Sequence, residues 1–121
     1  MIERIADLPS NVLGFTAEGT VMGTDYESTI IPAVEEALKH HARIRFLYHL
    51  GPGFTGFDAA ALWEDAKLGL AHFSGWERIA VVSDKPWVRA TVGAFSIVIP
   101  AKVRVFADDE FDAAREWVCE S

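Results

Sequence analysis

A glycine-rich stretch, residues 51–58 (GPGFTGFD), holds the residues of this chain best placed to do chemistry. It follows an apolar run that predicts a strand ending at Leu50, and it precedes a run that predicts a helix over residues 58–73. Turns after parallel strands are where open α/β domains usually place their ligand sites. We therefore expect a turn here, with the hydroxyl of Thr55 between two exposed aromatic rings, Phe54 and Phe57.

Thr55 is a candidate phosphoacceptor. A phosphate would add about −1.5 to −2 charge close to the predicted helix start, and helix N-termini favour anions. The alternative, which we favour, is that Thr55 only belongs to the turn or caps the helix. The glycines lack the Gly-Lys-Ser/Thr ending of a P-loop and the Gly-x-Gly-x-x-Gly pattern, so a nucleotide site is not predicted.

No other group of residues in the sequence forms a recognisable catalytic or metal-binding set. The histidines are scattered and lack metal-binding spacing, and no serine lies in a Gly-x-Ser-x-Gly context. The acidic pairs 35–36 and 64–65 are neighbours on predicted helices and do not face each other. We expect a non-enzymatic protein without cofactor or metal. The alternative is an uncharacterised enzyme that uses Asp84 or His49 near strand ends.

Apolar and aromatic residues are concentrated in the second and third predicted helices, residues 58–73 and 87–97, and in their flanks. Helices that are apolar around most of their circumference must bury it or leave a sticky patch. The ordinary interpretation is a core plus a homodimer interface. The sharper one is an apolar cleft between these helices for a hydrophobic ligand, a membrane lipid or a protein partner. Its candidate ligand-binding residues are Phe54, Phe57, Trp63, Lys67, Trp87 and Phe95.

The bulk composition narrows the class of protein. The 121 residues fit one domain, residues 1–121, and the net charge of 11 − 18 = −7 disfavours nonspecific nucleic-acid binding. Cys119 is the single cysteine, which excludes an internal disulfide. The N-terminus lacks a signal peptide pattern, and the most apolar tract, residues 92–99, is far shorter than the ~20 residues that span a bilayer. We expect a cytoplasmic protein, with peripheral membrane contact as an option.

Alternating apolar patterns predict five strands and four helices in the order β-β-α-β-α-β-α-β-α. This order predicts an α/β fold with a mixed, mostly parallel five-stranded sheet whose first strand is an antiparallel edge. The first helix has a capping box at Thr24 to Glu27, and Pro32 must kink it or move its start to about Thr29. The predicted strands are residues 2–8, 12–21, 42–50, 77–83 and 102–106, and the last helix begins after the acidic residues 108–110.

Residues along nearly the whole chain resemble the SpoIIAA-like proteins, a branch of the STAS fold shared with bacterial anti-sigma factor antagonists. The matching residues are Asp25, Tyr26 and Pro32, then 56–58 running into 62–65, then 77–82 with Asp84, Lys85 and Trp87, and finally Phe106, Ala114 and Trp117. The resemblance implies a mixed sheet with helices, comparable also to lipid-binding CRAL-TRIO domains, and no catalytic residues. The antagonists carry a phosphorylated hydroxyl in an Asp-Ser-Ser-Gly-like motif at the second helix. Here that place has a single hydroxyl, Thr55, and no preceding acid.

Overall fold

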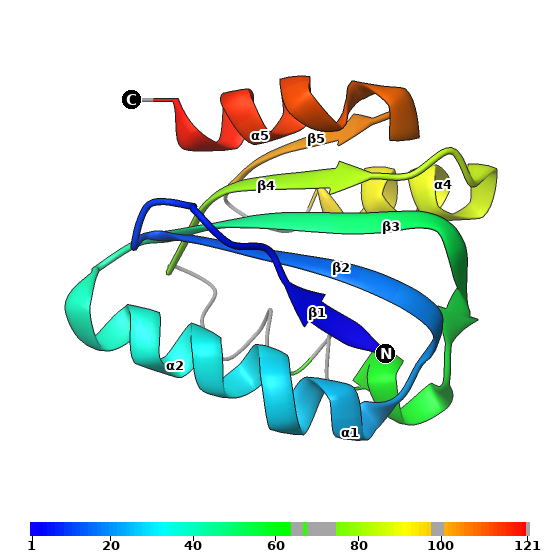
Figure 1. Ribbon diagram of the computed structural model, residues 1–121, viewed down its shortest axis with the longest axis horizontal. Helices are drawn as coiled ribbons and strands as arrows, with labels where there is room; N and C mark the ends of the chain where they lie inside the picture. The colour runs from blue at the N-terminus through cyan, green and yellow to red at the C-terminus, as the bar shows by residue number, and fades with distance from the viewer. Residues whose placement is uncertain (64–66, 68–74, 98–100, 121) are drawn as a thin grey trace.

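The chain folds around one five-stranded sheet in this computed structural model, which describes residues 1–63, 67, 75–97 and 101–120. The strands lie in sequence order across the sheet (Figure 1). β1 pairs antiparallel with β2, and each later pair is parallel, which confirms the predicted mixed α/β fold and its antiparallel edge. The strands are β1 Ile2–Arg4, β2 Val12–Val21, β3 Ile44–Phe57, β4 Trp76–Val82 and β5 Lys102–Phe106.

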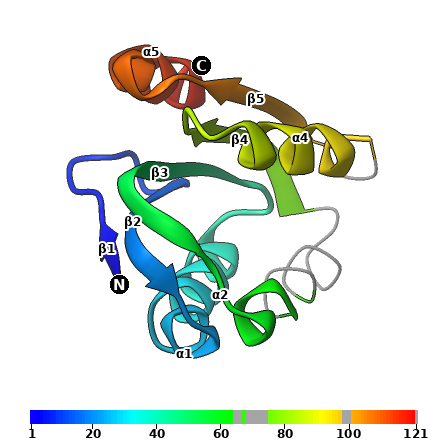
Figure 2. The same cartoon turned by 90° about the vertical axis from the view of Figure 1, so that its right-hand side faces the viewer.

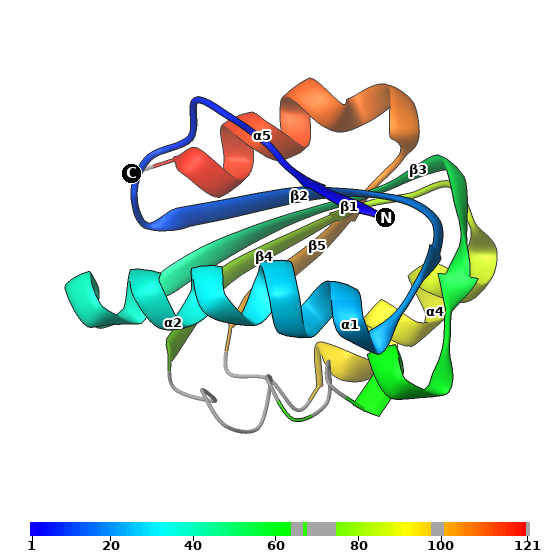
Figure 3. The same ribbon diagram turned by 60° about the horizontal axis from the view of Figure 1, so that its bottom comes forward.

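Helices cover both faces of the sheet (Figures 2 and 3). One face carries the helical segment made of α1 (Gly23–Asp25), a π-helical turn (Tyr26–Ile30) and α2 (Ile31–His40), together with residues 59–63 and α4 (Pro86–Phe95). The other face carries α5 (Phe111–Cys119), which a 3₁₀ turn at Asp108–Glu110 precedes. A parallel sheet covered on both sides has this three-layer arrangement.

Alternation along the central strands builds the two cores. Phe46 and Tyr48 of β3 belong to the core under α2 and α4, while Leu47 belongs to the core under α5. Ala80 and Val81 of β4 divide in the same way between the two cores. Successive side chains of a strand point to opposite faces, so a continuous apolar run becomes two buried layers.

β3 does not end at Leu50 as predicted, and the expected turn at residues 51–58 is wrong. The strand continues to Phe57 and pairs with Gly19, Thr20 and Val21 of β2 across two register shifts. Gly19 and Gly56 make this bend with φ angles of 63° and 142°, which side-chain-bearing residues rarely adopt. β4 pairs with β3 only as far as His49, so this end of β3 is an edge that tolerates Pro52.

The first helix also differs from the prediction. Its N-cap is Met22, whose backbone N–H donates to Asp25 Oδ2 at 2.8 Å, so the predicted capping box at Thr24 is wrong. The helical backbone begins at Gly23 and runs past Pro32 to His40, so it does not start near Thr29. The π-helical turn just before the proline widens the backbone there, because Ile31 N–H donates back to Tyr26 O.

Candidate functional site

The end of β3 and the start of α4 bring three of the six candidate ligand-binding residues together. The ring centroids of Phe54 and Phe57 lie 5.0 Å apart, those of Phe54 and Trp87 lie 5.8 Å apart, and those of Phe57 and Trp87 lie 6.3 Å apart. The Phe57 and Trp87 rings meet at 90°, an edge-to-face arrangement that aromatic pairs favour. We call these three residues the aromatic cluster.

Burial in the aromatic cluster is graded from the core to the surface. Phe54 is fully buried, Phe57 is half-buried and Trp87 is 46% exposed. The prediction that Phe54 is exposed is therefore wrong, because the residue lies in a strand rather than in a turn and its ring enters the core. Phe54 supports the two outer rings from below, and Trp87 is the ring that an approaching molecule would meet first.

The helical residues 59–63 add two more exposed apolar side chains at the same end of the sheet. Asp58 caps this helix, since its Oδ1 accepts from Ala61 N–H at 2.7 Å, and Asp58 N–H donates to Val21 O. Ala61 is buried, whereas Leu62 and Trp63 are 53% and 64% exposed. Within the described part of the chain, Trp63 has no ring contact with the aromatic cluster.

Less can be said of the position of two other candidate ligand-binding residues, Lys67 and Phe95. Lys67 is exposed, and Phe95 is the last residue of α4 with a side chain outside the description. Residues 64–66 and 68–74 of the predicted second helix lie outside the described residues. The apolar cleft between the second helix and α4 therefore stays a prediction.

α4 leaves an apolar stripe uncovered. Trp87, Ala90, Ala94 and Ile97 are all exposed, and their spacing of three and four residues places them along one side of the helix. Ile97, just beyond the end of α4, is 85% exposed, while Val88 on the opposite side is buried in the core. This surface agrees with the apolar surplus that the sequence indicated for this helix.

Thr55 lies in β3 and not in a turn at the start of a helix. Its side chain is exposed, and its hydroxyl oxygen is 3.0 Å from that of Thr20 on the neighbouring strand. The helix-capping role considered for Thr55 belongs to Asp58 instead. Phosphorylation of Thr55 stays a prediction.

A polar group lies at the carboxyl ends of β4 and β5, beside His49 in the middle of β3. Asp108 N–H donates to Asp84 Oδ1 at 3.0 Å, and Asp108 Oδ1 is buried without a hydrogen-bond partner in the described structure. Burial, followed by the nearby Asp84 carboxylate, raises the pKa of Asp108, while His49 and Lys85 oppose this effect. His49 Nδ1 lies 3.4 Å from Thr16 Oγ1.

Sequence reasoning named His49 and Asp84 but missed Asp108. A signal was present, because Asp84 and Asp108 each follow two residues after the end of neighbouring parallel strands. The carboxyl edge of such strands gathers the side chains that follow them. Among the described residues, no group of three or more His, Cys, Asp or Glu side chains is arranged to hold a metal ion.

Comparison with known proteins agrees with the geometry. The mixed five-stranded sheet with its helices is an α/β fold of the SpoIIAA-like type. The SpoIIAA-like family matches residues 12–119, and the chain belongs to this family. A search among curated proteins found no match.

One solved structure shares almost the whole architecture. It is an uncharacterised protein of the DUF3478 family from Shewanella loihica PV-4 with a SpoIIAA-like fold. It is 26% identical to this chain with a TM-score of 0.76, and the alignment covers 98% of this chain and 93% of that one. This fold suggests a regulatory or binding module. None of the helices in the described ranges is long and apolar enough to cross a membrane.

Proposed function

We propose that this chain is a non-enzymatic regulatory or binding module that takes an apolar occupant between its second helix and α4. The occupant is a hydrophobic ligand, a membrane lipid or a protein partner, and a second copy of the chain is one such partner. The observation that carries the proposal is the uncovered stripe of Trp87, Ala90, Ala94 and Ile97 on α4. Membership of the SpoIIAA-like family supports it.

The energetics of the uncovered surface favour an occupant. Burial of an exposed large apolar side chain contributes about 1.5–3 kcal/mol, and Trp63, Trp87 and Ile97 are each about half exposed or more. Part of this gain is lost in immobilising the occupant. Phe54 and Phe57 hold the Trp87 ring from behind, so the surface is largely preformed and little is spent in ordering it. The exposed cations Lys67 and Arg89 would lie at the rim, suited to an anionic head group.

Tryptophan fluorescence tests this proposal directly. The protein is titrated with a long-chain fatty acid and separately with vesicles of anionic phospholipid, and the emission is followed. We expect a blue shift of the exposed Trp63 and Trp87. The affinity read from the remaining Trp63 emission should be weakened by Trp87→Ser and largely retained by Trp87→Phe, because phenylalanine keeps the aromatic contact with Phe57. The shift persists in a Trp117→Phe background, since Trp117 belongs to α5 on the opposite face of the sheet.

Analytical ultracentrifugation and pull-down experiments test whether the occupant of the stripe is a protein. A dimer that Ile97→Lys and Trp87→Ser dissociate would assign the stripe to self-association. Loss of a captured partner in the same variants would assign it to another protein. A monomer that binds neither fatty acid nor vesicles and captures nothing through the stripe contradicts the proposal.

The alternative function, a phospho-switch of the anti-sigma antagonist type, depends on Thr55. Its exposed hydroxyl on the β3 edge is open to a kinase. Mass spectrometry of the protein from its native host tests this alternative, with Thr55→Val as the control that removes the hydroxyl and keeps the shape. An unmodified Thr55 under all growth conditions would eliminate it.

A further inference from the structure

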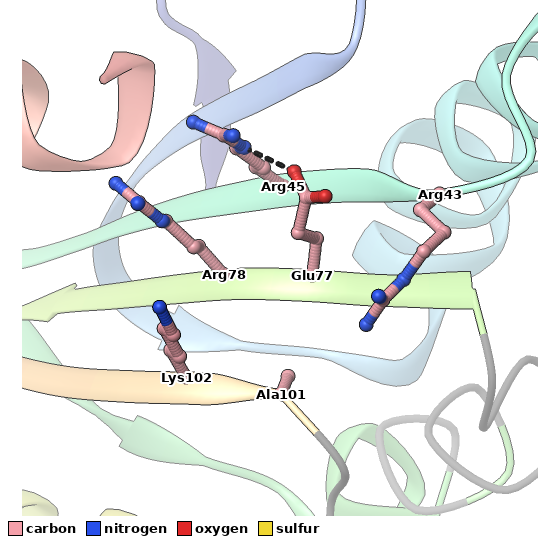
Figure 4. Close-up of a pocket in the computed structure, with 6 residues that line it drawn as sticks. All are labelled: Arg43, Arg45, Glu77, Arg78, Ala101 and Lys102. Atoms are coloured by element: carbon pink, nitrogen blue, oxygen red, sulfur yellow. Dashed lines mark hydrogen bonds and ion pairs between the residues drawn. The ribbon is translucent and has the colours of Figure 1, made fainter. Parts of the chain in front are cut away.

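Three cations form a row across the amino ends of the parallel strands. In the sheet register Arg45 of β3 pairs with Arg78 of β4, and Arg78 pairs with Lys102 of β5. Residues directly opposite each other in neighbouring strands point to the same face, so these side chains lie side by side (Figure 4). Like charges at such positions are destabilising, so the row needs negative charge or carbonyl oxygens close by.

A β-bulge supplies one carboxylate. The register passes from Ile44 opposite Trp76 to Arg45 opposite Arg78, which leaves Glu77 without a partner. Bulges re-aim side chains, and Glu77 Oε1 accepts from Arg45 Nε at 2.6 Å. This hydrogen bond is the main reason that the pKa of Glu77 is lowered. Glu77 therefore stays ionised at neutral pH and offsets one positive charge of the row.

Backbone carbonyl oxygens at the C-terminal end of α5 accept hydrogen bonds from the two arginines of the row. Arg78 Nη1 donates to Trp117 O at 2.7 Å, and Arg45 Nη1 donates to Val118 O at 2.9 Å and to Glu120 O. Cations are favourable at helix C-termini, so capping of α5 explains why Arg45 and Arg78 are positive. It does not explain Lys102, which is exposed and has neither a hydrogen bond nor an ion pair with any described residue.

These side chains line an open pocket of about 470 Å³ together with Arg43 and Ala101 (Figure 4). Arg43 Nη2 donates to Trp76 O at 2.8 Å, and its guanidinium has further donors. The pocket thus gathers four cations against one carboxylate in a chain whose net charge is −7. Such local segregation of charge focuses the field on an anion.

We propose that this pocket binds a phosphate group of a small ligand. Guanidinium groups match phosphate oxygens in shape and hydrogen-bond them in pairs, and a lysine beside them adds a mobile charge. The volume exceeds that of a phosphate ion, so the rest of the ligand fits beside it. The pocket lies at the amino ends of the strands, away from the aromatic cluster, and the inference does not depend on the proposed apolar site.

Titration calorimetry with pyrophosphate at an ionic strength of about 0.15 M, where the Debye length is about 8 Å, tests the pocket. Lys102→Gln should weaken binding about tenfold, because it removes a charge-assisted hydrogen bond. Glu77→Gln should tighten binding several-fold, because it removes the carboxylate that is hydrogen-bonded to Arg45 among the described residues. Arg4→Gln is the matched control: Arg4 is exposed on the opposite edge strand β1, four strand spacings or roughly 19 Å from the strand of Lys102 and two spacings or roughly 10 Å from that of Arg45, both beyond the Debye length of about 8 Å.

The variants are interpretable because Lys102 and Arg4 are exposed, and unchanged circular dichroism and melting temperature will verify their folds. Vesicles of phosphatidic acid against phosphatidylcholine show whether the phosphate belongs to a lipid. Binding of pyrophosphate alone assigns a free ligand, and vesicle binding that pyrophosphate competes away assigns a lipid head group. Absence of saturable binding to both probes overturns the proposal, as does equal weakening by Lys102→Gln and Arg4→Gln.

Discussion

Replacement of Asp108 by asparagine should stabilise this protein at neutral pH. The Asp108 Oδ1 atom is buried without a hydrogen-bond partner among the described residues, and the Asp84 carboxylate lies beside it. Asparagine has the same shape, carries no charge and can donate its amide N–H to Asp84. The backbone hydrogen bond from residue 108 to Asp84 Oδ1 is unaffected by the change.

The size of the effect follows from the unpaired oxygen. A buried acceptor left without a partner costs about 1–3 kcal/mol. His49 and Lys85 lower the pKa of Asp108 and offset part of the cost, so we expect a gain near the lower limit, about 1 kcal/mol. For a domain of this size that is an increase in melting temperature of roughly 4 °C.

The gain must depend on pH with a definite sign. Because the pKa of Asp108 is raised in the folded state, the folded protein holds this proton more tightly than the unfolded chain does. The native carboxylate therefore costs stability at pH values above both pKa values, and the cost disappears as the pH falls through them. Asp108→Asn should gain its full stability at about pH 7.5 and almost none at about pH 3.

Calorimetric melting of wild type, Asp108→Asn and Asp109→Asn across this pH range decides the matter. Asp109 is exposed in the same 3₁₀ turn, at a helix start where negative charge is favourable. Its replacement should leave the melting temperature unchanged or slightly lower. If Asp108→Asn were neutral at pH 7.5, or if its gain did not change with pH, the carboxyl repulsion inferred here would be absent.

Three glycine substitutions test the backbone, with urea midpoints as the measurement. A Cβ would meet no atom within 4 Å at either Gly56 or Gly93, so these two changes report conformation alone. Gly56→Ala should destabilise by about 1 kcal/mol or more at its φ of 142°, whereas Gly93→Ala inside α4 should stabilise by up to about 1 kcal/mol. The reasoning is wrong if both change stability in the same direction. Gly23→Ala would place its Cβ 2.7 Å from Ala60 Cβ, so it should destabilise the protein and change Trp63 emission; unaltered emission would contradict that contact.

Periodicity in the sequence was sufficient for the order of elements and for much of the core. The predicted strands 12–21 and 102–106 have the observed bounds of β2 and β5. Both are apolar at every second position or nearly so, which is the pattern of a strand. In β5 the exposed Lys102 and Arg104 alternate with the partly buried Val103 and Val105. The structure brings the candidate residues Phe57 and Trp87 into contact, because Phe57 ends β3 and Trp87 lies in the first turn of α4, which follows the neighbouring strand β4. Their role in ligand binding stays a prediction.

The end of β3 was missed because glycine and proline usually mark turns. Here Pro52 lies on a stretch of strand that lacks a β4 neighbour, and Gly56 adopts a positive φ while the strand still pairs with β2. Neither condition can be read from residue types, since both depend on how long the neighbouring strands are. The burial of Phe54 was missed for the same reason, because the sequence pattern placed this residue in a turn.

The phosphate pocket was invisible for a different reason. Arg45, Arg78 and Lys102 are far apart in the chain and become neighbours only through the strand register. That register includes the bulge at Glu77, which moves every later residue of β4 by one position. Alternation predicts which face a side chain takes but not which residue stands opposite it, so a row of charges across strands is not predicted.

β3 connects the two proposed sites, since Arg45 stands near its start and Phe54 and Phe57 near its end. Arg45 and Phe54 stand nine positions apart in β3, and the strand bends beyond Arg45, since the ring centroids of Tyr48 and Phe57 lie 6.3 Å apart. No residue belongs to both the pocket and the aromatic cluster, and sites without shared partners behave additively. Lys102→Gln and Trp87→Ser should therefore each impair only their own ligand, and the double variant should show the sum. A Trp87→Ser variant that also lost pyrophosphate binding would mean that the sheet transmits a change from one edge to the other.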